Sequence, residues 1–282
     1  MGQIIEITED NVDELSEYLG DDMAENIGRE YFFGLSSVDA LDEPTSAIVW
    51  CVKNTESFDD AESEICFFYA DNEDDGKELI DEYTERIPDD NVIRSLFEFE
   101  DIRDISCEIL ESSGFQTEKK EGKNLYGTLE EFMKPKLTGR KTPSYIVSLG
   151  SISQLQFRQG ITNCMFSGRV GVNEDLAMLP MDWYEEDISS CMVTDEKVNG
   201  FFLIHRKPSG ILMPVLLYAS GVDAQKNMLK MLRFSVNSAK ERYPGDTKVQ
   251  ILRHDEKTAA LADHLLPGQK GKEVLTGERA EA

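Results

Sequence analysis

The order of predicted helices and strands repeats once along this chain of 282 residues. Apolar residues recur at helical or alternating spacing, and each half gives helix, helix, strand, strand, helix, strand, helix, strand. Between the halves lies segment 134–143, which is basic, contains two prolines and has one apolar residue, as is typical of a linker. The repeat predicts two copies of one mixed α/β unit, an N-terminal domain at 1–133 and a C-terminal domain at 144–282.

The expected elements follow from apolar periodicity and from turn residues. In the first half they are a strand at 3–8, helices at 11–18 and 22–27, a hairpin of 31–37 and 45–53, a buried strand at 63–70, a helix at 74–87, a strand at 92–100, a helix at 102–112 and two strands within 116–132. In the second half they are helices at 151–166 and 182–191, a hairpin of 198–205 and 210–218, a helix at 223–243, a strand at 248–253, a helix at 256–265, a short strand at 272–275 and a frayed tail from 276.

Nearly all of the formal net charge of −26 lies in the first third of the sequence. Residues 1–100 contain 30 Asp or Glu against 5 Lys or Arg, whereas residues 101–282 contain 25 against 24. An acidic surface of this kind repels nucleic acid and anionic lipid, so we expect neither as a partner. It is either a solvated face or a docking surface for a basic partner.

The spacing of cysteine and histidine indicates neither a metal site nor a disulfide framework. The five cysteines form no C-x-x-C pair and the three histidines are scattered, so we expect reduced thiols and no bound metal. The longest apolar run, 211–219, is far shorter than the ~20 residues that span a bilayer. The first residues also lack the basic and apolar regions of a secretory signal. The sequence therefore predicts a cytoplasmic protein without a membrane partner.

One motif in each half points to a known superfamily. In the first half, strand 95–100 is followed by a helix that ends in Glu-Ser-Ser-Gly-Phe at 111–115. Glycine can end a helix in a left-handed conformation, and the apolar residue after it folds back onto the helix. A weaker copy, Leu-Ala-Asp-His-Leu-Leu-Pro-Gly, stands at 261–268. These motifs and the element order resemble the GNAT acetyltransferase superfamily, in which a helix ends in a Tyr-Glu-x-x-Gly-Phe-like signature.

The resemblance implies a fold and a cofactor. The implied fold has two tandem GNAT-like units, each a mostly antiparallel sheet flanked by helices, whose fourth and fifth strands run parallel and splay apart. The implied cofactor is acetyl-CoA, held between those two strands with its pyrophosphate at the start of the third helix, where free backbone N–H groups bind anions. Both halves lack the glycine-rich loop that the superfamily has at this place.

The two candidate cofactor loops differ in charge. Loop 71–77 of the first half carries four carboxylates, which would repel a pyrophosphate, so we expect that unit not to bind the cofactor. Loop 220–227 of the second half has small residues and leads into a helix with three basic residues at helical spacing. We expect acyl-CoA to bind there, and the candidate cofactor-binding residues are Ser220, Gly221, Val222, Ala224, Lys226 and Asn227.

The superfamily's general acid, a tyrosine of the fourth helix, is missing from both halves. Leu110 takes its position in the first motif, and Ala262 or Asp263 takes it in the second. The candidate substitutes are Tyr218 at the end of a strand and His205 on the preceding hairpin. An aromatic residue at a strand end usually packs, and an isolated histidine is usually structural, so the structural interpretation of both stays open.

Two functions remain open at this point. The first is an acyl-CoA-dependent N-acyltransferase whose acidic half attracts its acceptor, a small-molecule or peptide amine with positive charge. The alternative is a non-catalytic tandem GNAT-like binding or scaffold protein that uses the acidic surface for a basic partner. An α/β protein of different topology is a third interpretation.

Overall fold

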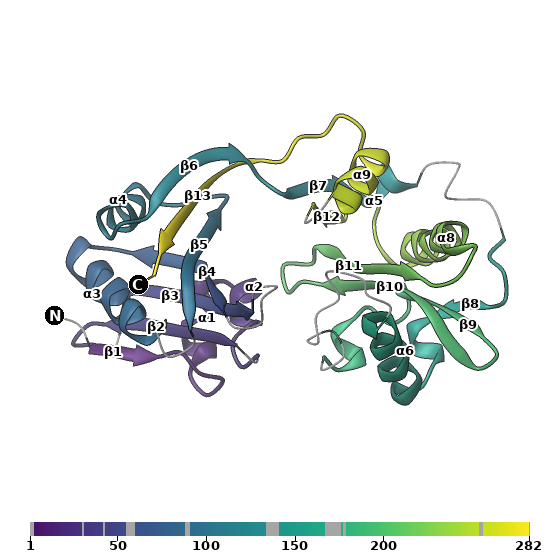
Figure 1. The fold of residues 1–282 in the computed structure, drawn as a ribbon, viewed down its shortest axis with the longest axis horizontal. Helices are drawn as coiled ribbons and strands as arrows, with labels where there is room; N and C mark the ends of the chain where they lie inside the picture. The colour runs from purple at the N-terminus through teal and green to yellow at the C-terminus, as the bar shows by residue number, and fades with distance from the viewer. Residues whose placement is uncertain are drawn as a thin grey trace. The chain divides into compact units, whose positions relative to one another are not determined.

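The computed structural model describes residues 3–29, 31–41, 43–54, 60–87, 91–133, 141–166, 176, 179–253 and 256–281. The chain forms two compact units, and each is described by itself (Figure 1). Unit 1 contains Met1–Gly122 together with Gly271–Ala282, and unit 2 contains Lys123–Lys270.

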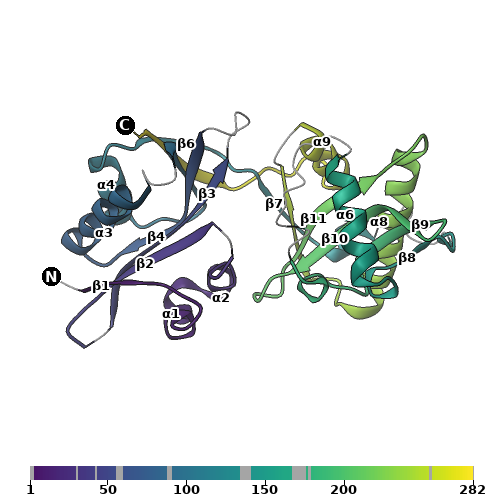
Figure 2. The same cartoon turned by 60° about the horizontal axis from the view of Figure 1, so that its bottom comes forward.

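Unit 1 is a seven-stranded sheet with helices on both faces. Its elements are β1 (Gln3–Glu6), α1 (Val12–Leu19), α2 (Asp21–Ala24), β2 (Phe32–Val38), β3 (Pro44–Asn54), β4 (Ala61–Ala70), α3 (Glu73–Arg86), β5 (Val92–Phe99), α4 (Asp104–Ser112), β6 (Gln116–Glu121) and β13 (Glu273–Ala280). The strand order is β1-β2-β3-β4-β5-β13-β6, and only β4 and β5 run parallel. Helices α1 and α2 cover one face, whereas α3 and α4 cover the other (Figure 2).

Unit 2 repeats this plan around a six-stranded sheet. Its elements are β7 (Asn124–Thr128), α5 (Leu129–Phe132), β8 (Ile146–Ser148), η2 (Leu149–Ser151), α6 (Gln154–Phe166), η3 (Met181–Trp183), β9 (Ser190–Thr194), β10 (Lys197–Arg206), β11 (Leu212–Ala219), α8 (Ala224–Arg242), β12 (Lys248–Leu252) and α9 (Glu256–Leu265). The strand order is β7-β12-β11-β10-β9-β8, with β11 and β12 parallel. One apolar cluster lies between the sheet and α5, α8 and α9, and a second lies on the α6 face. The predicted fold of two mostly antiparallel, helix-flanked sheets is confirmed.

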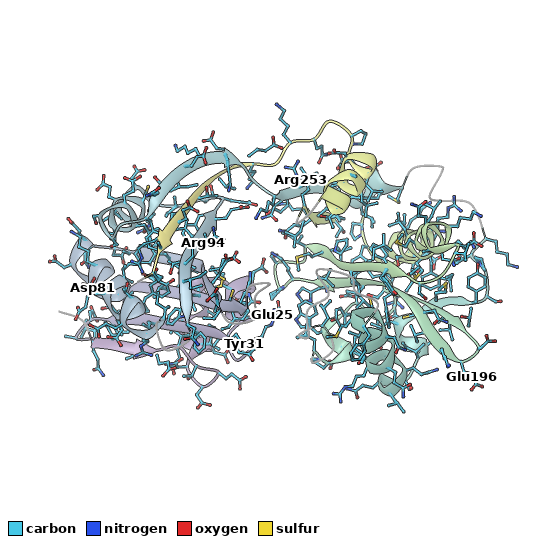
Figure 3. All side chains as sticks on the ribbon, in the orientation of Figure 1. Glu25, Tyr31, Asp81, Arg94, Glu196 and Arg253 are labelled. Atoms are coloured by element: carbon cyan, nitrogen blue, oxygen red, sulfur yellow. The ribbon has the colours of Figure 1, made fainter. Side chains whose placement is uncertain are left out.

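The last strand of the chain belongs to the first unit. Figure 1 shows β13 between β5 and β6, and antiparallel register pairs join it to both neighbours. The segment also carries Arg279, whose guanidinium pairs with Glu281 at 2.8 Å, both side chains being about 10% exposed. On the sheet itself, Arg94 of β5 (Figure 3) pairs with Glu62 of β4 and lies 3.8 Å from Glu278 of β13. Unit 1 is therefore completed by residues that follow unit 2 in sequence.

This connection moves the domain boundaries away from those expected at 133 and 144. The chain leaves unit 1 at Gly122 and enters unit 2 at once, because β7 pairs with β12 rather than with a strand of unit 1. Most of the expected linker, residues 134–140, lies outside the described residues. The expected frayed tail is also wrong, since 276–280 is part of β13.

The helix expected at 182–191 is wrong as well. The structure has the short turn η3 there, followed by strand β9. The buried Ser189 hydroxyl accepts a hydrogen bond from the backbone N–H of Ile204 at 3.0 Å, which fixes the chain beside β10. Serine side chains that bond to backbone groups in this way compete with helix formation. Strands β8 and β9 were not expected from the sequence.

The structure also bears on the cysteines, on metal binding and on membrane insertion. The five cysteines are free thiols, and Cys51, Cys164 and Cys191 are buried. Among the described residues, no group of three metal-ligating side chains comes together. No described helix is both long enough and apolar enough to cross a membrane.

Candidate functional site

Strands β11 and β12 of unit 2 touch at one point and then separate. Leu212 and Val249 form the one parallel register pair between these two fully described strands. In unit 1 the corresponding strands stay paired from Ala61 with Val92 to Ile65 with Phe97 and separate after that. Both units therefore have the predicted splay, and the splay of unit 2 opens earlier along the strands.

The loop that follows β11 is held to the neighbouring strand by Ser220. Its backbone N–H and its hydroxyl both donate to the carbonyl oxygen of Asn199, at 2.9 and 3.0 Å. Gly221 comes next with φ +89°, a conformation that side chains with a Cβ rarely adopt, and no heavy atom lies within 4 Å of where a Cβ would stand. Val222 is fully exposed. The chain thus turns sharply through Gly221 into α8, and the turn is open to solvent.

The start of α8 has no side-chain cap and no acidic residue in its first turn. The N–H groups of a first helical turn have no partner within the helix, and here Ala224 N–H donates to the Gly221 carbonyl at 3.2 Å. Asp223, just before the helix, forms an exposed ion pair with Lys226 at 2.8 Å. That pairing lowers the pKa of the Asp223 carboxyl and raises the pKa of Lys226. The turn therefore offers backbone donors, and its one nearby carboxylate already has a cationic partner.

Asn227 faces away from the splay. Its side-chain oxygen accepts from Lys230 at 3.0 Å, and Lys230 also donates to the Tyr145 hydroxyl at 2.6 Å. Tyr145 directly precedes β8, the edge strand opposite to the β12 side of the sheet. Of the six residues expected at the cofactor, five lie around the start of α8: Ser220, Gly221, Val222, Ala224 and Lys226. The side chain of Asn227 instead bonds to Lys230.

The two candidate catalytic residues lie on neighbouring strands but apart from each other. Tyr218 of β11 is paired with Phe201 of β10, whereas His205 of β10 is paired with Met213, four residues further along the strand. At ~3.3 Å per residue this separates them by roughly 13 Å. The His205 ring is 3% exposed, stacks on Trp183 at 3.7 Å, and its Nδ1 lies 2.8 Å from the Trp183 carbonyl. His205 therefore has a packed, structural environment, and Tyr218 is the half-buried residue nearer the open loop.

Unit 1 presents a different surface at the equivalent place. The Asn72 side chain accepts from the N–H of Asp75 at 2.9 Å and so caps α3 itself, and the first turn holds three carboxylates. The Asp75 carboxylate accepts in turn from Thr45 at 2.7 Å, and Asp71 pairs with Arg103 at 2.9 Å. One first-turn donor is thus already occupied, and the remaining surface is acidic.

The charges of the two units reinforce this contrast. Unit 1 has 39 acidic and 10 basic residues, a net charge of −29, whereas unit 2 has 16 acidic and 19 basic residues, a net charge of +3. An anionic ligand is therefore repelled by unit 1 and weakly attracted by unit 2.

A feature of unit 2 that was not expected from the sequence is an apolar cavity of about 70 Å³ that is partly open to its surroundings. It lies where β11 and β12 part, and side chains from β10, α5, α8 and α9 line the rest of its wall. Leu212 and Val249 are both in its wall. No sequence motif signals such a cavity, because it depends on which side chains meet at the junction of β11 and β12 after folding.

Solved structures of GNAT proteins are similar to this chain. The chain is similar over its whole length to a tandem GNAT protein from the clavulanic acid biosynthesis pathway, with a TM-score of 0.65, 9% identity and 99% of that chain covered. It is similar to a GCN5-related N-acetyltransferase from Kribbella flavida, with a TM-score of 0.51, 13% identity, and 99% of this chain and 70% of that chain covered.

A third similar structure is much longer than this chain. It is a fungal multi-domain beta-N-acetylglucosaminidase that contains a GCN5-related glucosamine N-acetyltransferase region, with a TM-score of 0.58 and 8% identity. The match covers 99% of this chain but 38% of that one. No protein-family model and no curated protein matches the sequence. The identities to these proteins are low, so the assignment of a tandem GNAT fold to this chain rests on the similarity of the structures.

Proposed function

We propose that this chain, with a GNAT fold in each unit, is an N-acyltransferase that binds acyl-CoA, with acetyl-CoA as the reference cofactor, in unit 2. The observation that carries the proposal is the contrast between the two helix starts. In unit 2 the helix after the splayed strand begins without a side-chain cap or an acidic first turn, whereas in unit 1 it is self-capped and acidic. Backbone donors at a helix start bind phosphate groups through hydrogen bonds and the helix dipole.

In this proposal the loop after β11 holds the pyrophosphate. Gly221 lets the chain turn so that the first N–H groups of α8 face outward, and Ser220 fixes the turn to β10. Lys226, which forms an ion pair with Asp223, adds a positive charge and can pair with a phosphate in place of that carboxylate. When bound, the cofactor supplies an activated thioester, and attack by an amine on its carbonyl needs mainly correct positioning.

Tyr218 is the residue that we assign to protonating the departing thiolate. It lies near the end of β11, two residues before Ser220, and is half-buried. His205 is the weaker candidate because its ring is buried and stacked on Trp183. Unit 1, which carries the excess negative charge, would attract a small-molecule or peptide amine with positive charge.

Calorimetric titration with acetyl-CoA tests the site through Gly221→Val. A valine at φ +89° is strained, so the loop must change its path, and we expect at least tenfold weaker binding. Gly210→Val is the matched control, because Gly210 has φ +84° and equally open surroundings but lies in the β10–β11 turn. We expect the control to bind like the wild type.

Three outcomes separate the interpretations. Equal binding by the wild type and both variants would disprove the site assignment. Binding without acyl transfer to any of a panel of polyamines and lysine peptides would favour the non-catalytic alternative. A wild type that binds no acetyl-CoA would overturn the proposed function.

A further inference from the structure

The cavity of unit 2 has walls that are apolar almost throughout. Among the described residues that line it, Ser235 of α8 is the only one with a polar side chain. The Ser235 hydroxyl donates to that of Ser190 at 3.1 Å, and Ser190 donates to the Met231 carbonyl. The one polar group in the wall therefore already has a partner, and the cavity offers no site for a polar ligand.

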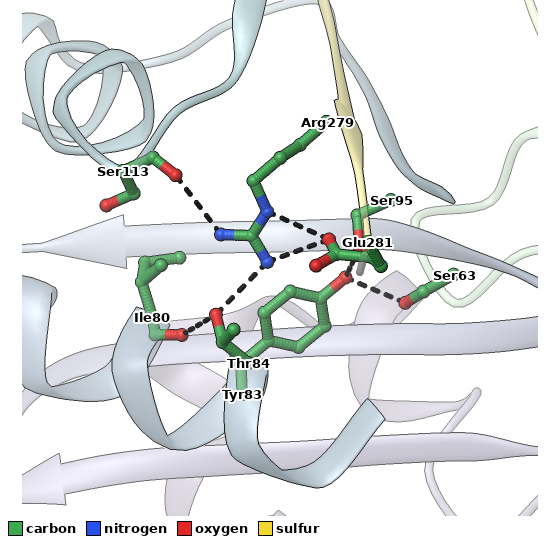
Figure 4. Close-up of polar contacts among 8 residues, drawn as sticks. All are labelled: Ser63, Ile80, Tyr83, Thr84, Ser95, Ser113, Arg279 and Glu281. Carbon is green, nitrogen blue, oxygen red and sulfur yellow. Dashed lines mark hydrogen bonds and ion pairs between the residues drawn. The ribbon is translucent and has the colours of Figure 1, made fainter. Parts of the chain in front are cut away.

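The equivalent space in unit 1 is filled. The buried residues Leu79, Ile80 and Tyr83 of α3 have a spacing that recurs twice among the buried residues of α8, at 231, 232 and 235 and at 235, 236 and 239. By this spacing Tyr83 corresponds to Ser235 or to Ala239, and both are small. Figure 4 shows the Tyr83 hydroxyl bonded to Ser63 of β4 at 2.8 Å and to Ser95 of β5 at 2.7 Å. These two serines are partners in the parallel register. In unit 1 a tyrosine thus closes the junction of the two parallel strands.

In unit 2 the same junction is left open. The parallel pair there is Leu212 with Val249, which carry no hydroxyl, and the residue of α8 that matches Tyr83 by spacing is small, Ser235 or Ala239. Ser235 and Ala239 both line the cavity. The smaller side chains leave a space that apolar atoms surround. An unfilled apolar space weakens a fold in proportion to its volume, so an apolar group that enters it is favoured.

The cavity lies on the path of the proposed cofactor. Leu217 of its wall is three residues before Ser220, which is roughly 10 Å along a strand. A cofactor whose pyrophosphate lies at the start of α8 and whose arm follows β11 brings its thioester toward the junction of β11 and β12. The group attached to that thioester then meets the cavity.

We propose that this cavity holds the hydrocarbon end of a short acyl group, which makes butyryl-CoA a better ligand than acetyl-CoA. This inference rests on the proposed function of unit 2. The size of the group follows from the volume, because an apolar cavity of ~150 Å³ binds benzene and one of about 70 Å³ has room for roughly half of its six carbons. A butyryl group has three carbons beyond its carbonyl.

Calorimetric titration of the full chain with coenzyme A, acetyl-CoA and butyryl-CoA is the test. Butyryl-CoA should bind about tenfold more tightly than acetyl-CoA, because two further methylene groups leave water. Ala239→Ile fills the cavity and should abolish this preference while coenzyme A itself still binds. Lys240→Ile puts the same side chain on the exposed face of the same helix and should keep the preference.

A second variant works in the opposite direction. Leu261 of α9 is a half-buried residue of the cavity wall, so Leu261→Ala enlarges the space and should shift the preference toward hexanoyl-CoA. Equal binding of acetyl-CoA and butyryl-CoA, together with binding of coenzyme A, would overturn the acyl pocket and leave the proposed function intact. Failure of all three to bind would overturn the proposed function and the pocket together.

Discussion

Single residues decide how the two units differ at the junction of their parallel strands. Tyr83 joins α3, β4 and β5 through one hydroxyl, packs edge-on against Trp50 and is fully buried. Thr84, its neighbour, accepts from Arg279 of the last strand at 3.1 Å (Figure 4). This small part of unit 1 therefore connects three strands and a helix from distant parts of the sequence.

Replacing Tyr83 by phenylalanine should destabilise unit 1. The change leaves two buried serine hydroxyls without their partner, which costs about 1–3 kcal/mol. Urea unfolding followed by the fluorescence of Trp50, with Trp183→Phe in both proteins to remove the signal of unit 2, measures the effect. Tyr31→Phe, at a position of unit 1 that is 53% exposed (Figure 3), should change the free energy of unfolding by less than about 0.5 kcal/mol. Equal stability of Tyr83→Phe and the wild type would contradict a structural role for the hydroxyl.

The same tyrosine predicts a dependence on alkaline pH. Burial raises the pKa of Tyr83 to about 12, above the ~10 of an exposed tyrosine. Because the folded state holds the proton more tightly, this contribution to stability is complete below about pH 10 and is lost as the pH rises through 12. The difference in unfolding midpoint between the wild type and Tyr83→Phe should therefore shrink between pH 10 and 12. A difference that stays constant over this range would contradict the assignment.

The sequence correctly predicted the structure of residues whose contacts are to near neighbours in the chain. Gly114 has φ +92°, and the N–H of Phe115 donates back to the Leu110 carbonyl at 3.2 Å, as the motif at the end of α4 required. Phe115 is buried against Phe97. The contrast between Tyr83 and the small residues Ser235 and Ala239 of α8 was not predicted, because it depends on which residues share a junction after folding.

At the scale of elements, the main departure from expectation is that β13 follows unit 2 in sequence but belongs to the sheet of unit 1. A strand at 272–275 was predicted, but local pattern gives no information about which sheet a strand joins. The segment Thr276 to Arg279 was predicted to be a frayed tail because it is mostly polar. It is polar because the strand exposes much of one face. Gly277 allows the close approach, since a Cβ there would lie 2.3 Å from Phe97. The hairpin of β10 and β11 was predicted correctly because its two strands are neighbours in sequence.

A chain that ends at Lys270 should lose the fold of unit 1 and keep that of unit 2. Its β5 and β6 would each lose a hydrogen-bonded neighbour, and the Arg279–Glu281 pair would be absent. The chain has one tryptophan in each unit, Trp50 and Trp183, so Trp183→Phe and Trp50→Phe variants report on the units separately. The Trp50 signal should resemble that of unfolded protein, and the Trp183 signal should remain native.

A peptide of residues 271–282 provides the control for this truncation. Added to the shortened chain, it should restore the Trp50 signal by taking the place of β13. Cooperative unfolding of unit 1 in the truncated chain without the peptide would show that β13 is dispensable.

At the scale of the whole molecule, charge is divided as unevenly as the sequence indicates. The net charge of −29 on unit 1 outweighs the +3 on unit 2. We expect the protein to pass through a heparin column without retention at 0.15 M salt, where charges act over ~8 Å, and to bind an anion exchanger. Retention on heparin under these conditions would contradict the exclusion of polyanionic partners.

Because β13 completes unit 1 but follows unit 2 in sequence, it also sets the order in which the two units of a newly made chain can finish folding. Unit 2 is continuous from Lys123 to Lys270, whereas unit 1 is incomplete until β13 has been synthesised, and β13 follows unit 2 in the sequence. At 5–20 residues per second, the ribosome needs roughly 10–30 s between the end of β6 and the end of β13. During that interval β5 and β6 expose unpaired edges that can join strands of other chains. The unit encoded first is therefore completed second, and the nascent protein is most prone to aggregation in its N-terminal half.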